Sequence, residues 1–374
     1  MKSNYEPLGK HIQLVDYRNS EEVTSTVLGI SIDKEFMPSV ANVIGTDLSR
    51  YKLISKGLFA CNPMHVGRDE RLPIALYEKA NPAIVSPAYF MFEIIDRDVL
   101  NEEYLMMWFR RPEFDRECWF MTDGSVRGGI TWDDLCRIKL PVPSYARQCE
   151  IVESYRAITD RIALKRAEND NLEATGLAIF KEKFSSPNDG FDETPLYDLA
   201  EYINGTSFSE DEYSSDGLPI IKIAELKDGI TSATQYFVGN KDTKYLIHDS
   251  DVFSWSGNPD TSIDAFIWSH GDGILNQHTF RMVPRYGVAF TYFMLKFCKP
   301  EFVKAAMGKQ TTGLGHVTVK DLKRLTLPFN EETAFLFNQA AMPLYEQIFK
   351  NLKEINALIE LKNQTVQMLS IINH

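Results

Sequence analysis

The chain has 374 residues, of which 44% are hydrophobic and 25% charged, and its formal net charge is −12. This composition excludes a disordered chain, and the length predicts two or three globular domains. The acidic balance argues against a nucleic-acid partner unless positive charge is gathered onto one face or supplied by a partner, because no long segment is basic.

The N-terminal sequence MKSNYEPLGKHIQLV lacks the apolar core of a signal peptide, and no apolar run approaches the ~20 residues of a membrane span. The five cysteines show no Cys-x-x-Cys spacing, so neither a disulfide framework nor a structural zinc site is expected. These features predict a protein of a reducing cytoplasm with no membrane partner.

The first part of the chain predicts a mixed α/β domain over residues 1–143. Strands are expected in VSPAYFMFEII (85–95), which is rich in β-branched and aromatic residues, and helices in NEEYLMMWFRRPEF (101–114). The domain closes with GGITWDDLCRIKLPVP (128–143). Residues 144–185 then predict one long helix, because they contain no proline and their apolar residues follow a helical period.

The second part predicts another α/β domain over residues 186–330, whose first residues belong to the turn-rich linker SSPNDGFDETP (185–195). A strand is expected in HTFRMVP (278–284) and a helix over residues 289–307. A second long helix is expected over residues 331–374.

The end of the second domain, GHVTVKDLKRLTLPFN (315–330), is a near copy of 128–143. Further matches follow in the same order along the chain, which predicts an internal duplication. They pair Pro7-Leu8 with Pro195-Leu196, Asn62-Pro63 with Asn258-Pro259, Thr131 with Thr318, Asp134 with Asp321, and Leu140-Pro141 with Leu327-Pro328. The alternative is two unrelated domains that share turn dipeptides.

Alternating steps of four and three in both long helices pick out a narrow apolar seam, which predicts a coiled coil. Its apolar members are Ile151, Tyr155, Ile158, Ile162, Leu172, Ile179, Leu344, Ile348, Ile355, Leu358 and Leu369. Polar seam positions restrict the register, and they are Lys165, Asn169, Asn351 and Lys362. Pro343 predicts a bend or a fresh helix start. The alternative is two amphipathic helices, each packed on its own domain.

An antiparallel pairing of two helices of ~40 residues, each ~60 Å long, would set two globular heads at opposite ends of a rod. The heads would be related by an approximate two-fold axis. Double-stranded DNA has two-fold axes perpendicular to its length, so such a molecule can read two half-sites at a fixed spacing. Because the two heads differ in sequence, we expect two unlike half-sites.

Motifs for catalysis are missing from the sequence. It contains no phosphate-binding glycine loop and no dinucleotide-binding glycine pattern, and its seven histidines lack metal-ligand spacings. We therefore expect no catalytic, cofactor-binding or metal-binding residues in this chain. One loose pattern, Asp216 followed by Glu225 and Lys227, is compatible with a metal-dependent nuclease if Glu225 and Lys227 lie on a strand. The alternative is that these residues are solvated charges on loops.

The chain resembles the specificity subunit of Type I restriction–modification systems (the HsdS family). The resemblance covers almost the whole chain and rests on residues 51–76, 85–93, 127–184 and 316–329. Its most telling part is the run leading into the first long helix, formed by Leu140, Pro141, Pro143, Gln148 and Ile151. The second copy departs from the pattern, since PFNEETAFLF stands where the family's proline and glutamine are usual. Contacts at the start of the second helix are therefore expected to be weaker.

The resemblance implies two target-recognition domains (1–143 and 186–330), each followed by a spacer helix (144–185 and 331–374), with the helices paired as an intramolecular antiparallel coiled coil. It implies a bacterial or archaeal, non-catalytic subunit that binds double-stranded DNA, two DNA methyltransferase subunits and restriction subunits. The complex would read a bipartite, asymmetric target with a fixed gap and direct adenine methylation or ATP-dependent restriction. S-adenosylmethionine, ATP and Mg²⁺ would belong to the partner subunits, with no cofactor in this chain.

Base-edge recognition needs Arg, Lys, Asn, Gln or small hydroxyl side chains on turns that can approach a groove. In the first domain such residues are Ser31, Lys34, Ser39, Asn42, Arg68, Arg71, Ser125 and Arg127. In the second they are Thr206, Ser207, Asn258, Thr261, Ser262, Lys309, Gln310, Thr311, Thr312 and His316. The alternative for each residue is an ordinary polar turn. The polar turn just before each copy of the duplicated motif is the favoured place.

The competing interpretation is a tandem module that binds protein or glycan on a coiled-coil rod, which the net charge of −12 would suit.

Overall fold

The computed structural model describes residues 5–39, 45–64, 66–122, 128–185, 190–255, 259–309 and 315–369, with the side chains of 253–255 and 260 left out. The chain divides into two compact units. Unit 1 comprises Met1–Asp160 and Glu360–His374, and unit 2 comprises Arg161–Ile359. Each long helix contributes one part to each unit, so the predicted domain limits at 143, 185 and 330 stay predictions.

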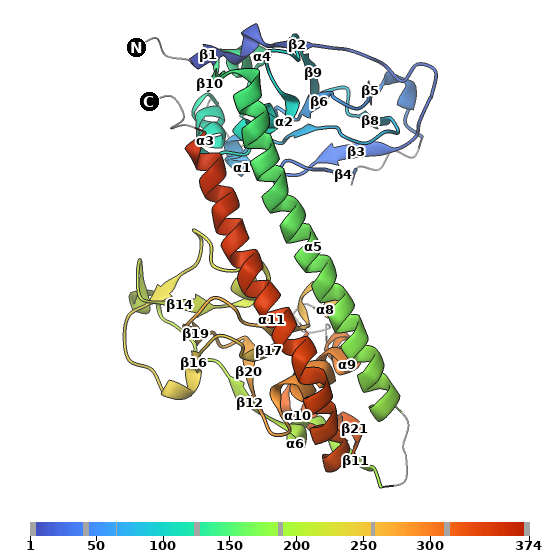
Figure 1. Ribbon diagram of the computed structural model, residues 1–374, viewed down its shortest axis with the longest axis vertical. Coiled ribbons are helices and arrows are strands. Elements are labelled where there is room, and N and C mark those ends of the chain that lie inside the picture. Colours follow the sequence, from blue (N-terminus) through green and yellow to red (C-terminus); the bar gives the residue numbers. More distant parts are fainter. Residues whose placement is uncertain are drawn as a thin grey trace. The chain divides into compact units, whose positions relative to one another are not determined.

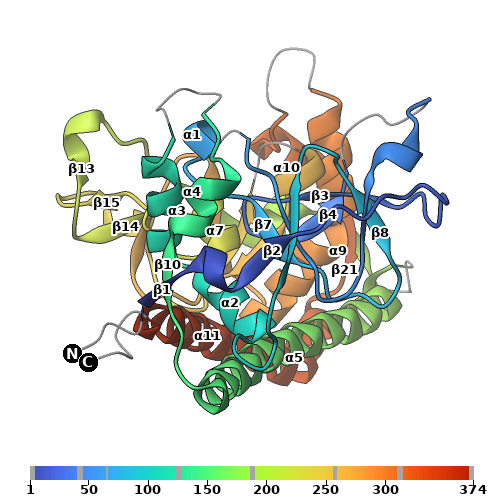
Figure 2. The same ribbon diagram turned by 90° about the horizontal axis from the view of Figure 1, so that it is seen from above.

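Unit 1 is a mixed α/β fold. Its strands are β1 (Tyr5–Pro7), β2 (Ile12–Leu14), β3 (Val27–Ile30), β4 (Phe36–Pro38), β5 (Lys52–Ile54), β6 (Phe59–Cys61), β7 (Ile74–Leu76), β8 (Ala83–Val85), β9 (Phe90–Ile94) and β10 (Lys139–Pro141). Its short helices are α1 (Val66–Asp69), α2 (Glu102–Phe109), α3 (Pro112–Phe120) and α4 (Trp132–Arg137), with 3-10 turns η1 (Leu8–Lys10) and η2 (Leu48–Arg50). Helix α1 lies beside α3 (Figure 2).

Unit 2 is also a mixed α/β fold. Its strands are β11 (Asp192–Pro195), β12 (Ala200–Asn204), β13 (Tyr213–Ser214), β14 (Leu218–Ile221), β15 (Tyr236–Phe237), β16 (Leu246–Ile247), β17 (Val252–Trp255), β18 (Ala265–Ile267), β19 (Gly273–Leu275), β20 (Thr279–Pro284) and β21 (Thr326–Phe329). Its helices are α6 (Leu196–Leu199), α7 (Ile223–Asp228), α8 (Pro259–Ser262), α9 (Val288–Met307) and α10 (Val319–Arg324), with 3-10 turns η3 (Glu210–Glu212) and η4 (Thr243–Tyr245).

The strand topology of the two units is the same. One sheet has the order β2-β9-β6-β7 in unit 1 and β12-β20-β17-β18 in unit 2. The other has the order β4-β3-β8-β5 in unit 1 and β15-β14-β19-β16 in unit 2, where β13 adds a further strand. In both, the central pair is parallel and its flanking pairs are antiparallel. The predicted duplication is therefore present in the fold.

The duplicated motif forms the same structure in each unit. Its threonine caps a short helix, α4 or α10, and its Leu-Pro pair lies in the strand that follows. That strand, β10 or β21, pairs antiparallel with the first strand of its unit, β1 or β11. The motif thus closes each globular part at the point where the chain enters a long helix.

The predicted strand and helix segments are present, with two subdivisions. Residues 85–95 contain the end of β8 and all of β9, separated by a turn. Residues 101–114 span α2 and the start of α3, because Pro112 occupies the first turn of a new helix, where its missing N–H costs nothing.

The two long helices are α5 (Tyr145–Phe184) and α11 (Glu331–Met368), coloured green and red in Figure 1. Within unit 1, Ile151 and Tyr155 of α5 share a buried cluster with Val366 and Leu369. Within unit 2, Phe180 of α5 packs edge-to-face on Phe337 of α11, with ring centroids 5.1 Å apart. Within unit 2 the two helices run antiparallel, because Lys165 contacts Asn351 and Phe180 contacts Phe337. Every predicted apolar seam residue is buried or half-buried.

A polar layer interrupts the seam in unit 2. Asn351 is 1% exposed, donates to Asn169 Oδ1 at 2.8 Å and accepts from Lys165 Nζ at 3.0 Å. Lys165 also pairs with Glu168 at 2.9 Å and Glu354 at 3.5 Å. Sliding either helix by one residue would leave these buried groups without partners, so the layer opposes changes of register.

The expected fresh helix start at Pro343 is wrong, because α11 runs through it without interruption. A proline inside a helix leaves the carbonyl four residues earlier, here that of Gln339, without its N–H partner. Both residues are exposed, so water can bind that carbonyl oxygen and the helix continues.

Candidate nucleic-acid interface

In unit 1, the described end of the polar turn before the duplicated motif is tied to α1. The Gly67 amide donates to the Gly128 carbonyl at 2.9 Å, and the Ile130 amide donates to the Pro63 carbonyl at 3.2 Å. Gly129 lies so close to Pro63 that an added Cβ would be 2.6 Å from its carbonyl oxygen. The end of the turn is therefore held beside the Asn62-Pro63 segment and α1.

Unit 2 has the same arrangement. An added Cβ on Gly315 would lie 2.2 Å from the Ala306 carbonyl oxygen and 3.4 Å from the Pro259 ring. The end of the second polar turn is thus held between the last turn of α9 and the start of α8. In both units the proline of the Asn-Pro pair (Pro63 or Pro259) and a glycine at the end of the polar turn (Gly129 or Gly315), which are distant in the sequence, meet at one edge.

The turn after β3 joins this edge in unit 1. Arg71 forms an ion pair of 3.2 Å with Asp33, which brings residues 31–35 beside α1. Arg68 pairs with the neighbouring Asp69 at 2.6 Å, and its side chain is exposed. The Ser31 hydroxyl accepts a hydrogen bond from the Glu35 amide at 3.3 Å. Ser31, Arg68 and Arg71 thus lie on one edge, and both arginines have acidic neighbours.

Lys34 lies in the same turn, but the structure contradicts its assignment as a base contact. Its side chain is 4% exposed, and its ammonium group donates to Asp115 Oδ1 at 2.6 Å and to the Leu72 carbonyl at 2.8 Å. The backbone at Lys34 has a positive φ of 66°, which turns the side chain into this buried site. Lys34 therefore stabilises the fold. Ser39 bonds through its amide to Val27 and lies at the end of β4.

In unit 2, the predicted residues Thr206 and His316 lie near a third segment, the turn Asn276–His278. Thr206 forms an isolated bridge with Asn276. The His316 ring stacks on the His278 ring, with centroids 6.1 Å apart and an interplanar angle of 7°. Gln277 and His278 are exposed. This edge therefore presents imidazole, amide and hydroxyl groups to solvent.

The other predicted base-contact residues of unit 2 that the structure describes make contacts within the globular part of that unit. Lys309 donates to the His316 carbonyl at 3.2 Å and pairs with Asp321, so it stabilises the start of α10. Lys227 donates to the Thr261 carbonyl and, at 3.4 Å, to the Ser262 hydroxyl. Ser262 is buried, which contradicts its assignment as an exposed base contact. The Ser207 carbonyl accepts from Lys241 Nζ at 3.1 Å.

Several predicted residues lie outside the described residues: Asn42, Ser125, Arg127, Asn258, Gln310, Thr311 and Thr312. For these residues, contact with DNA bases stays a prediction.

Sequence reasoning missed the turn Asn276–His278. His278 was assigned to the strand that begins at Thr279. The available signal was the run of amide and imidazole side chains, Asn-Gln-His, directly before an apolar strand, which is typical of a turn that presents hydrogen-bonding groups.

The nuclease pattern is not supported by the local structure. Glu225 lies in helix α7, where its carboxylate accepts from the Lys222 amide at 3.0 Å, and it is buried. Asp216 lies on an exposed turn and accepts from the Ser214 hydroxyl at 2.9 Å. A strand-borne acid-x-Lys pair is therefore wrong for these residues. Over the described residues, no group of three His, Cys, Asp or Glu side chains has the geometry to hold a metal ion.

The duplicated aspartates have shifted pKa values. Hydrogen bonds from the Thr131 hydroxyl and amide, with a smaller contribution from Arg137, hold the pKa of Asp134 below its usual value. Burial raises the pKa of Asp321, but hydrogen bonds from Lys309 and Thr318 more than offset this, so its pKa is also lowered. Both carboxylates are therefore held ionised as helix caps.

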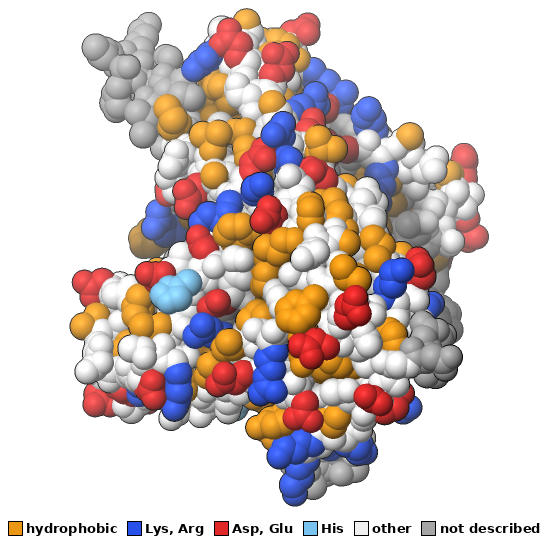
Figure 3. All heavy atoms as spheres, turned by 60° about the horizontal axis from the view of Figure 1, so that its bottom comes forward, with side chains coloured by type: hydrophobic (Ala, Val, Ile, Leu, Met, Phe, Trp, Pro, Cys, Tyr) orange, Lys and Arg blue, Asp and Glu red, His pale blue; other side chains and the backbone are white. Residues whose placement is uncertain are grey.

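Lys and Arg side chains are interspersed with Asp and Glu on the face shown in Figure 3. That face carries no extended basic area of the kind that binds DNA without sequence preference. None of the described helices is long and apolar enough to cross a membrane.

Comparison with known proteins identifies the fold and the type of domain. Residues 188–369 match the model of the Type I restriction modification DNA specificity domain. Over 314 residues the chain is 23% identical to the Type I restriction enzyme MjaIX specificity subunit of Methanocaldococcus jannaschii, covering 74% of this chain and 70% of that protein. The Type I restriction–modification S subunit from M. genitalium has the same fold, with a TM-score of 0.54, 13% identity, and coverage of 98% of this chain and 95% of that one.

The domain match covers unit 2 from residue 188 onward and continues to residue 369, and the N-terminal part of unit 1 repeats the same strand topology. Residues 188–369 therefore carry a Type I restriction modification DNA specificity domain, and the chain as a whole is similar to Type I restriction specificity subunits.

Proposed function

We propose that this chain reads a bipartite DNA target, with one half-site recognised by the globular part of each unit, and that it performs no catalysis itself. Two DNA methyltransferase subunits and restriction subunits would act on the sequence that it selects. S-adenosylmethionine, ATP and Mg²⁺ would be bound by those partners. The target would be asymmetric, with two unlike half-sites separated by a fixed gap.

The observation that carries the proposal is the repeated edge. In each unit the described end of the polar turn before the duplicated motif lies beside the proline of the Asn-Pro pair, Pro63 or Pro259, close to a short helix. The two edges share a scaffold but carry different side chains: arginines in unit 1, and imidazole and amide groups in unit 2. A common scaffold with different hydrogen-bonding groups supports recognition of two different base sequences.

The charge distribution favours base contacts by this chain and phosphate contacts by its partner subunits. The net charge is −12, and the exposed arginines of unit 1 have acidic neighbours. Contacts to phosphates position a protein on DNA, whereas contacts to base edges specify the sequence. We therefore assign base readout to this chain and expect the methyltransferase subunits to supply much of the phosphate binding.

Selection from a duplex DNA library would test the proposal. The library would carry randomised half-sites and gaps, and the chain would be used in complex with the methyltransferase subunits of its host. We expect enrichment of two unlike half-sites at one gap length. Failure to enrich any sequence would contradict the proposal, and salt-dependent binding without sequence preference would do the same.

A double variant at the unit 2 edge tests whether this edge recognises one of the two half-sites. Replacing Gln277 and His278 together by alanine should lower discrimination at one half-site by about 1–3 kcal/mol, the usual contribution of a good base contact. The other half-site should be unaffected. Asn240→Ala, an exposed change elsewhere in unit 2, serves as the control. Equal weakening on unrelated sequences would identify these residues as phosphate contacts instead.

The competing function is a tandem module for protein or glycan. It would be favoured by failure of the assembled complex to retard duplex DNA at low salt, where phosphate contacts are strongest.

A further inference from the structure

Two loops of unit 2 are bound tightly to each other. Residues 248–251 connect β16 with β17, and residues 268–272 connect β18 with β19; we call them the anchor loops. The Ser250 amide donates to the Trp268 carbonyl at 2.6 Å, and the Trp268 amide donates to the Asp251 carbonyl at 3.0 Å. Asp249 Oδ1 accepts from the Gly271 amide at 2.6 Å. The two loops therefore behave as one structural piece.

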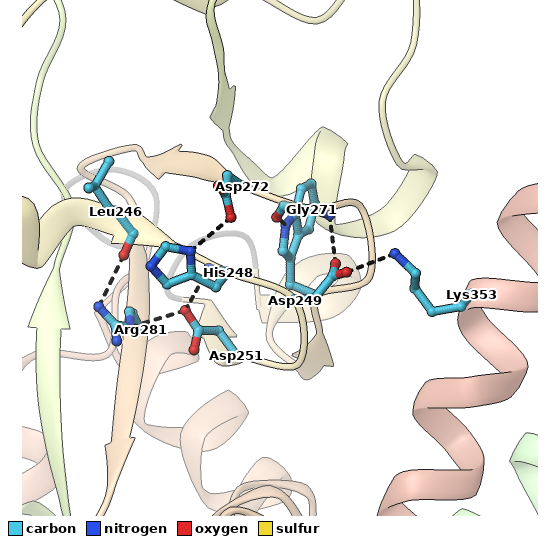
Figure 4. Close-up of polar contacts among 9 residues, drawn as sticks. Leu246, His248, Asp249, Asp251, Gly271, Asp272, Arg281 and Lys353 are labelled. Carbon is cyan, nitrogen blue, oxygen red and sulfur yellow. Dashed lines mark hydrogen bonds and ion pairs between the residues drawn. The ribbon is translucent and has the colours of Figure 1, made fainter.

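Side chains tie the anchor loops to the sheets of the head. The ring nitrogen of His248 lies 2.8 Å from Asp272, joining one loop to the other (Figure 4). Arg281, on β20, pairs with Asp251 at 3.1 Å and donates to the Leu246 carbonyl at 3.0 Å. Because these strands belong to the two larger sheets of unit 2, a force applied to the anchor loops is transmitted to most of the globular part of the unit.

Helix α11 holds the anchor loops at three points. Lys353 pairs with Asp249 at 2.7 Å (Figure 4). The Asn356 amide donates to both the carbonyl and the hydroxyl of Ser269, each at 3.0 Å. The hydroxyl of Tyr345, a fully buried side chain, donates to the Ser250 carbonyl. The three contacts extend over about 16 Å of helix, which resists rotation of the head about any single contact.

The backbone of the anchor loops carries strain at the point where α11 holds it. Ser250 has a φ of 74°, in the left-handed region that favours glycine. Its equivalent in unit 1 is Gly57, which has a φ of 87° and makes the same amide bond, to the Tyr77 carbonyl at 2.9 Å. A non-glycine residue in this conformation costs of order 1 kcal/mol or more and persists only where its surroundings over-determine it. The bonds from Tyr345 and Trp268 provide that constraint.

We propose that Tyr345, Lys353 and Asn356 are positioning residues that fix the globular part of unit 2 on its spacer helix and thereby set the gap between half-sites. The proposal rests on the proposed function, that of reading a bipartite target. A rod of fixed length defines a fixed spacing only if the reading surface cannot pivot on it. The three contacts remove that freedom without touching the candidate DNA-binding edge, so they act on the gap and not on base preference.

The test uses the same duplex library and the assembled complex. The variants are Tyr345→Phe, which removes one hydroxyl and keeps the ring; Lys353→Met and Asn356→Ala; and the triple variant. Lys350→Met, on an exposed position of the same helix, is the matched control. Lys353→Arg keeps the charge and should restore the wild-type result. Thermal unfolding of each variant is measured alongside.

For the triple variant we expect both half-site sequences to be retained, while the preference for the natural gap over gaps one base pair longer or shorter falls about tenfold, equivalent to 1.4 kcal/mol. The control should match the wild type. Unchanged gap preference in a folded triple variant would overturn the proposal, as would loss of one half-site sequence with the gap retained. If the triple variant does not fold, the gap preference of the single variant Lys353→Met tests the proposal. That variant should fold, because the ion pair it removes is partly exposed and does not contribute to core packing.

Failure of the proposed function gives a different result. In that case the wild-type complex selects no paired half-sites, and no gap preference exists to be changed.

Discussion

At the scale of single residues, the duplicated Thr-x-x-Asp shows what the repeat encodes. Asp134 accepts from the Thr131 amide at 2.9 Å, and the Thr131 hydroxyl accepts from the Asp134 amide at 3.1 Å. Thr318 and Asp321 form the same reciprocal pair. These residues cap a short helix that closes each globular part, so their recurrence reflects scaffold and not DNA contact.

The Asp134 cap predicts a defined pH dependence. Its folded pKa lies below its unfolded value of about 4, so the stabilisation is present above that pH and is lost as the pH falls through the folded pKa. Asp134→Asn should therefore lower the free energy of unfolding at pH 7, with a difference from wild type that shrinks toward pH 3. Urea unfolding across this range measures it, with the exposed Asp133→Asn as control. A difference independent of pH would contradict the assigned cause.

At the scale of elements, the attachment of α11 to α9 differs from what the family pattern predicts. In unit 1, Gln148 accepts from the Asn101 amide at 2.9 Å and donates to the Val99 and Pro143 carbonyls, which holds α5 at the start of α2. The equivalent position in the second copy is Phe335, which is exposed. The expectation of weaker contacts there stays a prediction, but Asn338, one helical turn later, makes hydrogen bonds to the start of α9.

Asn338 supplies the N-terminal cap that α9 lacks. The cap position of α9 is Gly287, which has no side chain, and Asn338 Oδ1 accepts from the Ala289 and Phe290 amides at 3.1 and 3.2 Å. Asn338→Ala should therefore lower the free energy of unfolding by about 1 kcal/mol, the usual cost of losing a cap. Denaturant unfolding measures it, and the exposed neighbour Gln339→Ala is the control. Equal stability of the two variants would refute the capping role.

At the scale of the whole molecule, the proposed reading of a bipartite target predicts that the gap between half-sites depends on the length and register of the spacer helices. The polar layer of Lys165, Asn169 and Asn351 opposes slippage. Inserting seven residues into both α5 and α11, after Asp160 and Ile359, preserves the seam and lengthens each helix by about 10 Å. The preferred gap in library selection should lengthen. A seven-residue insertion in the exposed segment 238–240 should leave it unchanged. An unaltered gap in the double insertion would refute the spacing role of the helices.

Much of the architecture could be predicted because it depends on local pattern. The helical period of residues 144–185 and 331–374, the capping threonines and the internal repeat are all properties of residues close together in the sequence. The candidate edge was predicted only in part. Nothing local indicates that Lys34 reaches Asp115, or that His316 stacks on His278, because each pair is brought together by the packing of separate strands.

The sequence by itself determined the duplicated α/β fold, the two long helices and their seam, since periodicity, caps and turn residues act over a few residues. The tertiary structure decided which polar groups face solvent and which are consumed by the fold: Lys34 and Ser262 are buried, whereas Gln277 and His278 are exposed. It also decided how the globular part of unit 2 is attached to α11, through Asp249, Ser250 and Ser269. The physical reason is that burial and ion pairing depend on contacts between residues up to about a hundred positions apart, which no local pattern specifies.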